Sequence, residues 1–323
     1  MPGHHRIYAQ GSDVRQAAQG DLTDLLATTL SRQAGEAKAG FAATLNVGLV
    51  GRGIAASRSP VMHELEGRRL GLDYAYHRID FDALELDDGM LPAVLSCLAE
   101  LGFVGVNVTH PFKQAALAQL HRLGPSARAI GAVNTVVFDA EAWTGHNTDS
   151  WGFAESLRTG LRGARLGSVV LVGAGGAGLA VARALVDLGC GRLAVADRAR
   201  ERAQRLVDSL GGGIAAQAVD PADLPDRLAQ ADGLVNATPV GMIGHPGLPV
   251  PGAAIGPPLW VADIVYFPEE TELVRLAERR GCRTLRGTGM AINQAVKAFE
   301  LFTGRKPDPA SMARHFRQAA AVL

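Results

Sequence analysis

The stretch SVVLVGAGGAGLAVARALVDLGCGRLAVADR, residues 168–198, decides the fold of the second part of this chain. An apolar run at 169–172 leads into a glycine-rich turn, and an alanine- and leucine-rich segment follows. A second apolar run, LAVA, is followed directly by an aspartate, Asp197. Strand, glycine turn, helix and strand within about thirty residues predict a βαβ unit of a Rossmann-type parallel sheet.

The spaced glycines of this turn have separate physical roles. Gly173 permits the tight turn, Gly175 lets backbone N–H groups approach a pyrophosphate, and Gly178 lets helix and strand pack closely. The helix N-terminus adds partial positive charge towards the phosphates. A glycine-rich turn without a ligand is the alternative interpretation. We predict cofactor contacts along the whole turn, at Gly173, Ala174, Gly175, Gly176, Ala177 and Gly178.

The residues after the second strand bear on the choice of dinucleotide. Asp197 lies 19 residues after Gly178, where an acid accepts hydrogen bonds from the adenosine ribose hydroxyls and repels a 2′-phosphate. Arg198 and Arg202 follow, and arginines in this loop can hold that phosphate or stack on the adenine. The sequence therefore favours NAD, with NADP as the alternative.

Composition limits the classes of function. The 323 residues are 47% hydrophobic and 20% charged, with a formal net charge of +0, which favours a globular protein without a nucleic-acid footprint. Three widely spaced cysteines and no apolar run of membrane-spanning length favour a soluble, cytoplasmic protein without disulfides or a metal site. We expect no nucleic-acid or membrane partner, and either a monomer or a homodimer.

Before the glycine turn, apolar and helical patterns alternate. The strands that we predict there lie at 44–51, 74–81, 102–109 and 132–140, and the helices between them at 59–71, 88–102 and 113–124. This order predicts a second, largely parallel α/β sheet. After the turn, strands are predicted at 233–238 and 259–266, and a strongly periodic helix at 291–304. Residues 1–44 are polar and alanine-rich, with one amphipathic stretch at 21–30, and are expected to be a flexible extension without chemistry.

Polar side chains gather where the predicted strands of the first part end. Hydroxyls, amides, one lysine and one aspartate lie there, at Ser57, Ser59, Asn107, Thr109, Lys113, Asn134, Asn147, Thr148 and Asp149. Ligands of open α/β sheets bind outside the carboxyl ends of the strands. Taken singly, Ser59 could cap a helix and Asn134 could sit in a turn. Together they predict a lining for a small polyhydroxylated molecule.

The chain resembles the shikimate dehydrogenase family from about residue 45 to its end. The motifs that carry the resemblance are SRSP at 57–60, NVTHPFK at 107–113, GAVNT at 131–135, GHNTD at 145–149, GAGGAG at 173–178, NATPVGM at 236–242 and GTGMAINQA at 287–295. Through SRSPVMHE, THPFKQA and VADR it is most similar to the NAD-dependent quinate/shikimate dehydrogenase branch. The resemblance implies reversible oxidation of the 3-hydroxyl of shikimate or quinate to the 3-dehydro compound.

The resemblance also implies roles for single residues. Lys113 and Asp149 match the catalytic pair. The substrate-binding positions that match are Ser57, Ser59, Asn107, Thr109, Asn134, Tyr266 and Gln294. Those that flank the cofactor, besides the glycine turn, Asp197, Arg198 and Arg202, are Asn236, Thr238, Met242 and Gly289. No metal is implied.

The chemistry of Lys113 suits this role independently. Removing a hydride from an alcohol carbon requires loss of the hydroxyl proton, and a lysine can accept that proton or stabilise the developing oxyanion. The sequence leaves both roles open. Many family members carry Asn-Arg-Thr where this chain has Asp197-Arg198-Ala199, which supports NAD. Ser59 matches the shikimate-type serine, whereas some quinate users carry threonine, and Asn293 can affect tolerance of quinate's extra hydroxyl.

Three other functions are compatible with parts of the sequence. They are a folate-type Rossmann dehydrogenase with a catalytic lysine, an enzyme acting on a related cyclic polyol acid, and a metabolite sensor without catalysis. The expected fold class is α/β with two domains, whose C-terminal helices return to the first. The substrate domain is placed at 45–151 and 290–323, and the Rossmann domain at 152–289.

Overall fold

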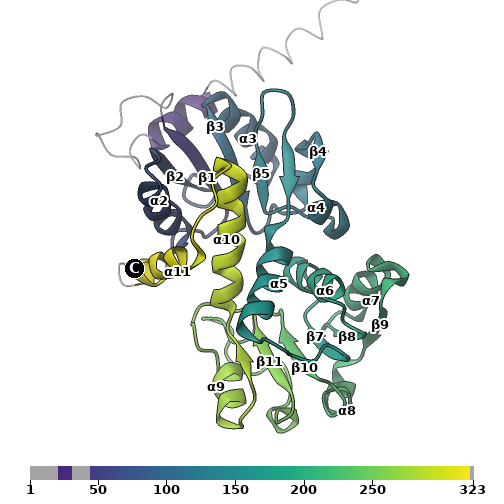
Figure 1. The fold of residues 1–323 in the computed structure, drawn as a ribbon. Helices are drawn as coiled ribbons and strands as arrows, with labels where there is room; N and C mark the ends of the chain where they lie inside the picture. Colours follow the sequence, from purple (N-terminus) through teal and green to yellow (C-terminus); the bar gives the residue numbers. More distant parts are fainter. Residues whose placement is uncertain (1–20, 31–43, 321–323) are drawn as a thin grey trace, which may run out of the picture. The chain divides into compact units, whose positions relative to one another are not determined.

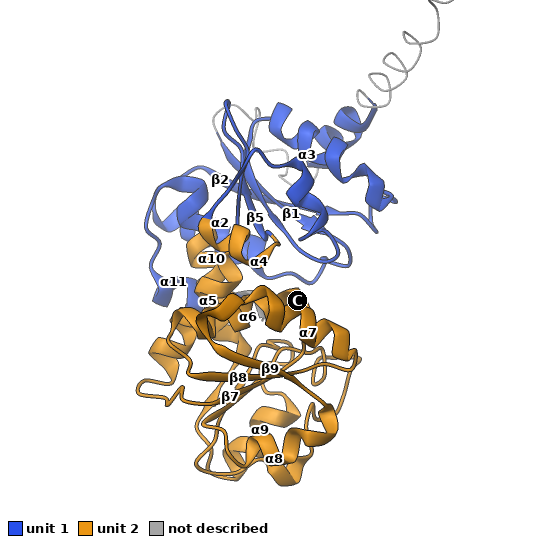
Figure 2. Ribbon diagram, turned by 90° about the vertical axis from the view of Figure 1, so that its right-hand side faces the viewer, with its two compact units in different colours: residues 1–124, 133–146, 299–323 blue, residues 125–132, 147–298 orange. Residues whose placement is uncertain are grey.

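The structure is a computed structural model that describes residues 21–30 and 44–320. Two compact units make up the chain, each built on one six-stranded sheet (Figures 1 and 2). Unit 1 comprises residues 1–124, 133–146 and 299–323, and unit 2 comprises residues 125–132 and 147–298. One division falls within helix α10 (Gly287–Thr303). The functional domains predicted at 45–151 with 290–323, and at 152–289, stay a prediction.

Unit 2 has an all-parallel sheet in the strand order β12-β11-β10-β7-β8-β9. Its strands are β7 (Val169–Val172), β8 (Arg192–Ala196), β9 (Ala215–Val219), β10 (Gly233–Asn236), β11 (Trp260–Asp263) and β12 (Thr284–Leu285). Its main helices are α4 (Pro125–Ile130), α5 (Thr148–Gly160), α6 (Gly176–Asp187), α7 (Arg200–Ser209), α8 (Leu224–Leu228), α9 (Glu272–Arg279) and most of α10. The predicted strand–turn–helix–strand unit is β7-α6-β8.

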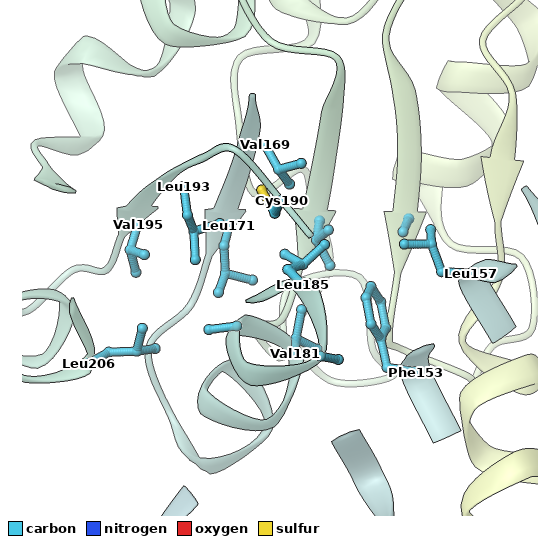
Figure 3. Packing of buried hydrophobic residues seen from close by; sticks show 14 of the residues in the cluster. Phe153, Leu157, Val169, Leu171, Val181, Leu185, Cys190, Leu193, Val195 and Leu206 are labelled. Carbon is cyan, nitrogen blue, oxygen red and sulfur yellow. The ribbon is translucent and has the colours of Figure 1, made fainter. Parts of the chain in front are cut away.

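Helices cover both faces of this sheet because its strands are apolar on both sides. Side chains alternate along a strand, so Val169 and Leu171 of β7 pack with α5, α6 and α7 (Figure 3). Val170 and Val172 pack on the opposite side with α8 and α9. Near-continuous burial of this kind is the mark of a parallel sheet with crossover helices on each face.

Unit 1 has a mixed sheet in the strand order β2-β1-β3-β5-β6-β4. Its elements are β1 (Leu45–Gly51), α2 (Ser59–Arg69), β2 (Tyr74–Asp80), α3 (Leu91–Glu100), β3 (Phe103–Val108), β4 (Arg122–Leu123), β5 (Thr135–Val137), β6 (Thr144–His146) and α11 (Pro309–Ala320). Strands β1, β2 and β3 are parallel, as predicted. However, β5 runs antiparallel to both β3 and β6, which the sequence did not indicate.

The helix predicted at 113–124 is wrong. The chain forms a short 3-10 segment (Ala115–Gln119) and then β4, which pairs with β6. The Trp143 carbonyl accepts the N–H groups of both His121 and Arg122 at 3.1 Å, so these N–H groups bond to a distant segment instead of to a preceding turn. The apolar spacing of the segment is helical, but long-range pairing overrides it.

Residues 21–30 form a helix rather than a flexible arm. Leu22, Leu26 and Leu30 are buried, and their spacing of four puts them on one side of the helix. The Thr23 hydroxyl lies 3.1 Å from the sulfur of Cys97 in α3. The rest of the extension predicted at 1–44 lies outside the described residues, apart from Thr44.

The C-terminal residues return to unit 1, as predicted. Phe299 of α10 stacks on Tyr74 with ring centroids 5.2 Å apart. The N–H of Asp308, just before α11, donates to the buried Glu66 carboxylate of α2 at 2.9 Å. Arg69 pairs with the same carboxylate at 2.7 Å, and these partners lower the pKa of Glu66 against the effect of its burial. This network fixes α11 on α2.

Candidate functional site

Lys113 lies in a turn that unit 1 fixes at several backbone positions. It follows β3, and its own carbonyl accepts the Val133 N–H at 2.8 Å. Earlier in the turn, Thr109 N–H donates to the Val50 carbonyl at 2.9 Å, at the end of β1. Phe112 is buried against Phe81, with ring centroids 4.4 Å apart. The half-buried Lys113 therefore projects from a rigid turn rather than from the predicted helix.

The loop between β1 and α2 carries the two predicted serines. Ser57 is held through its carbonyl, which accepts Arg78 Nη2 at 3.0 Å, and its hydroxyl accepts the Ser59 N–H at 3.3 Å. Ser59 is the first residue of α2, and that helix has no side-chain cap. The Ser59 hydroxyl is therefore not used as a helix cap, which was the structural alternative for it.

A buried polar network joins three of the predicted substrate residues of unit 1, which are Ser59, Asn107 and Asn134. The Asn107 amide group donates to the Asn134 carbonyl at 3.1 Å and to the Thr135 hydroxyl at 3.0 Å. That hydroxyl in turn donates to the Asn134 side-chain oxygen at 3.0 Å. The Tyr76 hydroxyl donates to the Asn107 side-chain oxygen at 2.9 Å and is also hydrogen-bonded by Ser59. The side chains of Tyr76 in β2, Asn107 in β3, Thr135 in β5 and the preceding Asn134 are thereby held in fixed orientations.

Sequence reasoning did not single out Tyr76 and Thr135, which connect this network. Burial raises the pKa of Tyr76, so its hydroxyl keeps its proton and stays a donor. The sequence held a signal for Tyr76. In the strand predicted at 74–81, side chains alternate between two faces, so Tyr76 lies on the same face as Arg78. Thr135 directly follows Asn134 and is the last residue of the GAVNT motif at 131–135.

Asp149 lies in unit 2, in the first turn of α5. The preceding Asn147 is the N-cap, and its side-chain oxygen accepts the Asp149 N–H at 3.1 Å. The Asn147 amide group donates to the Ala132 carbonyl at 3.1 Å. Thr148 donates to the side-chain oxygen of Gln294 in α10 at 3.4 Å. Asp149 and Gln294 are thus placed by neighbouring helices of one unit.

The glycine turn lies at the carboxyl end of β7, as predicted. Gly173 has a φ of +104°, and a Cβ there would be 2.7 Å from the Ala237 carbonyl carbon. A Cβ on Gly178 would be 2.0 Å from the Gly173 carbonyl oxygen. In contrast, a Cβ on Gly175 or Gly176 meets nothing within 4 Å, and both residues are exposed at the start of α6. Two glycines are needed for packing, and two leave open backbone that fits a phosphate.

Asp197 is tied to the glycine turn. Its carboxylate accepts the Ala174 N–H at 2.8 Å and the Ala199 N–H at 2.9 Å. Strands β7 and β8 end at the same level, with Val172 opposite Ala196, so the residue after each strand lies at one edge of the sheet. Arg198 and Arg202 are exposed.

The remaining predicted residues lie at the same unit's strand ends and in α10. Asn236 is the last residue of β10 and is buried, while Thr238 is half-buried and Met242 is 39% exposed. Tyr266, which follows β11, is 45% exposed. A Cβ on Gly289 of α10 would be 2.2 Å from the Ser156 hydroxyl, so this glycine allows α5 and α10 to approach.

Over residues 21–30 and 44–320, no helix is both long and apolar enough to cross a membrane. In the same part of the chain, no group of three His, Cys, Asp or Glu side chains is arranged to hold a metal ion.

Known protein families match residues in both units of the chain. The family described as the shikimate dehydrogenase substrate binding domain matches residues 49–136. Shikimate/quinate 5-dehydrogenase matches residues 158–241, and the shikimate 5′-dehydrogenase C-terminal domain matches residues 287–315. A shikimate dehydrogenase (NADP+) of Streptomyces avermitilis is 50% identical over 280 residues, which are 85% of this chain and 96% of the relative. The chain belongs to the shikimate dehydrogenase family.

The chain is similar both to relatives named for NADP+ and to relatives named for NAD+. A quinate/shikimate dehydrogenase (NAD+) of Corynebacterium glutamicum is 47% identical over 84% of this chain and 97% of the relative. A quinate dehydrogenase structure from that organism, in complex with NAD, has a TM-score of 0.81 at 47% identity and covers 85% of this chain and 99% of that one. A shikimate dehydrogenase from Thermus thermophilus, with NADP(H) and shikimate, has a TM-score of 0.77 at 36% identity and covers 85% and 100%. The predicted family and two-domain α/β class are confirmed.

Proposed function

We propose that this chain is an NAD(P)-dependent dehydrogenase that reversibly oxidises the 3-hydroxyl of shikimate, quinate or both to the 3-dehydro compound. The observation that carries the proposal is the buried network of unit 1, which joins the side chains of Ser59, Asn107 and Asn134 by hydrogen bonds through Tyr76 and Thr135. Hydroxyl and amide groups held in this way suit a substrate with several hydroxyls and a carboxylate. A site built to hydrogen-bond such groups discriminates strongly against analogues that lack them.

Lys113 and Asp149 are the catalytic residues in this proposal. Oxidation at an alcohol carbon requires the hydroxyl to lose its proton, which the Lys113 ammonium group, once deprotonated, can accept. As a cation, the same group stabilises the oxygen as negative charge develops on it. Asp149 supplies the carboxylate that the family's catalytic pair requires. Substrate contacts are assigned to Ser57, Ser59, Asn107, Thr109, Asn134, Tyr266 and Gln294.

The residues of unit 2 fit a dinucleotide. The open backbone at Gly175 and Gly176, at the N-terminus of α6, suits a pyrophosphate, and Asp197 suits ribose hydroxyls. When bound, NAD or NADP supplies the hydride acceptor of the reaction. NAD is the preferred cofactor in this proposal, because the Asp197 carboxylate repels a 2′-phosphate at the edge where the ribose lies. Arg198 and Arg202 can hold the 2′-phosphate of NADP, which makes NADP a second cofactor in this proposal. Asn236, Thr238, Met242 and Gly289 are assigned to the nicotinamide half.

Initial rates with shikimate and quinate, each against NAD and NADP, test this function. We expect reduction of NAD with at least one of the two acids and slower reduction of NADP. Activity with NADP and shikimate alone would reassign the cofactor choice to Arg198 and Arg202. Absence of turnover in all four mixtures, with NADH still bound, would refute the enzyme and favour the metabolite sensor. Fractionation of cells and sedimentation test the cytoplasmic location and the choice between monomer and homodimer.

A further inference from the structure

A buried aspartate outside the predicted site lies at the end of β11. Asp263 is 2% exposed and stands opposite Asn236 in the sheet register. One of its oxygens accepts the Asn236 amide N–H and the Val265 N–H, both at 3.0 Å. The other accepts the Thr271 hydroxyl at 2.6 Å. A carboxylate with this many donors in the interior orients the groups around it.

Asn236 extends this network into the loop that follows β10. Its side-chain oxygen accepts both the N–H and the hydroxyl of Thr238, at 3.0 and 2.7 Å. Its amide group donates to the Val240 carbonyl at 3.0 Å, and the Val240 N–H donates to the Thr238 hydroxyl at 3.1 Å. The backbone of 238–240 is therefore fixed by two side chains, and Asp263 orients the first of them.

The same loop lies between the glycine turn and Thr271. The Ala237 N–H donates to the Val172 carbonyl at 2.7 Å, and a Cβ on Gly173 would be 2.7 Å from the Ala237 carbonyl carbon. At the loop's other end, a Cβ on Gly241 would be 3.3 Å from the Thr271 Cβ. A shift of the Asp263–Thr271 pair would therefore move a segment that touches the phosphate-binding turn.

A role in filling space alone does not explain the residue. Burial raises the pKa of Asp263 to about 6, so its charge is costly at this position. An apolar side chain would avoid that cost, but it would leave the Asn236 amide group and the Thr271 hydroxyl without an acceptor. The buried acid therefore serves the orientation of its neighbours.

We propose that Asp263 is a positioning residue that, through Asn236 and Thr271, holds residues 237–242 in the conformation that binds the nicotinamide half of the cofactor. This inference rests on the proposed function, since it assigns the loop to that cofactor. Asp263 does not touch the reacting atoms in this proposal; it acts through the loop.

NADH affinity of the full chain, measured by fluorescence titration well below the melting temperature, tests the role. We expect Asp263→Ala to weaken NADH binding about tenfold or more, since small misplacements of binding groups have large effects. Asp263→Asn keeps an acceptor for Asn236 and Val265, so it should restore affinity to within about threefold, a single lost hydrogen bond being of modest net value.

Asp232 provides a matched control in the same unit. It precedes β10 at the opposite end of the sheet, and its carboxylate accepts the Ser168 N–H at 2.9 Å. Asp232→Ala should lower stability while leaving NADH affinity unchanged. Where Asp263→Ala does not fold, Thr271→Val and Thr271→Ser replace it, with loss of affinity expected only for valine.

Three outcomes decide the matter. Weakened binding in Asp263→Ala, or in Thr271→Val, together with rescue by the conservative variant supports the positioning role. Affinity equal to that of the wild type in Asp263→Ala, or in Thr271→Val where the alanine variant does not fold, overturns it while leaving the proposed function standing. A wild-type chain that binds neither NADH nor NADPH overturns both.

Discussion

Replacing Gly178 by alanine is expected to destabilise unit 2 without any ligand being involved. The added Cβ would lie 2.0 Å from the Gly173 carbonyl oxygen and 2.9 Å from its carbon, whereas nonbonded heavy atoms rest at roughly 3.5–4.0 Å. The carbonyl cannot simply retreat, because the Gly173 N–H donates to the Ala196 carbonyl at 2.8 Å. Relief of the clash requires helix α6 and the glycine turn to separate.

The size of the effect follows from this geometry. Over-packing a well-packed site costs about 1–3 kcal/mol, and a clash with backbone belongs at the upper end. In a unit of this size, 1 kcal/mol shifts the melting temperature by about 2–4 °C. We expect Gly178→Ala to lower the melting temperature of the unliganded protein by about 6–12 °C, measured by scanning calorimetry.

Two neighbouring glycines separate folding from binding in this experiment. A Cβ on Gly176 or Gly175 meets nothing within 4 Å, so either alanine variant should change stability by no more than about 0.5 kcal/mol. Gly175→Ala should nevertheless weaken NADH binding, because its Cβ stands where the pyrophosphate approaches the backbone. A Gly178→Ala protein that melts within a degree or two of the wild type would refute the packing argument. Unchanged NADH affinity in Gly175→Ala would refute the phosphate role.

Four further outcomes are expected. Lys113→Ala should lower turnover about 100-fold or more, with NADH affinity near normal, and an unchanged rate would remove it from the site. Asp197→Ser should raise kcat/KM with NADP relative to NAD, and an unchanged ratio would contradict its role in the choice. Leu26→Ala should lower the free energy of unfolding, measured with urea, by about 2–5 kcal/mol. Leu25→Ala, at a side chain that is 43% exposed, should lower it by no more than about 0.5 kcal/mol, and equal losses would mean that the helix is not packed. Burial raises the native pKa of Asp263 from 3.8 to about 6, so the unfolded chain loses this proton first as pH rises. The stability of the wild type relative to Asp263→Asn should therefore fall by about 2 kcal/mol between pH 4 and pH 7, and a flat difference would contradict the burial of charge.

The Rossmann unit was predictable because its signals are local. Val169–Val172 is apolar on both sides, Gly173 ends it, and α6 begins within the next few residues, so strand, turn and helix each follow from neighbouring residues. Asp197 was predictable for the same reason, since it directly follows the next strand. The close contact that requires Gly178 is also local, because it is with the Gly173 carbonyl, whereas the contact that requires Gly173 is with Ala237, directly after β10.

The segment after Lys113 was not predictable from its own residues. Its alanines and leucines have helical spacing, yet β4 forms because Gly124 N–H donates to the Gly145 carbonyl at 2.8 Å and Trp143 accepts two more N–H groups. Both partners lie about twenty residues away, and β6 is only three residues long, too short to give a periodic signal. The packing of residues 21–30 likewise depends on a distant helix, through Thr23 and Cys97.

The carboxyl ends of the strands locate the predicted cofactor residues of unit 2, but they do not locate all the predicted substrate residues of unit 1. In unit 2, Val172 lies opposite both Ala196 and Asn236, and Asn236 lies opposite Asp263. All four strands thus end at one level, which places Asp263 beside Asn236.

In unit 1, Thr135 begins β5 and lies opposite Asn107, near the end of β3. Asn134 therefore lies just before the start of an antiparallel strand, and no count of residues to a strand's carboxyl end would place it beside Asn107. What Asn107 and Asn134 share is one end of the unit 1 sheet, where β3 ends and β5 begins. The sequence indicates which end of the sheet a residue lies at only where neighbouring strands are parallel. The reversed direction of β5 is visible only in the structure.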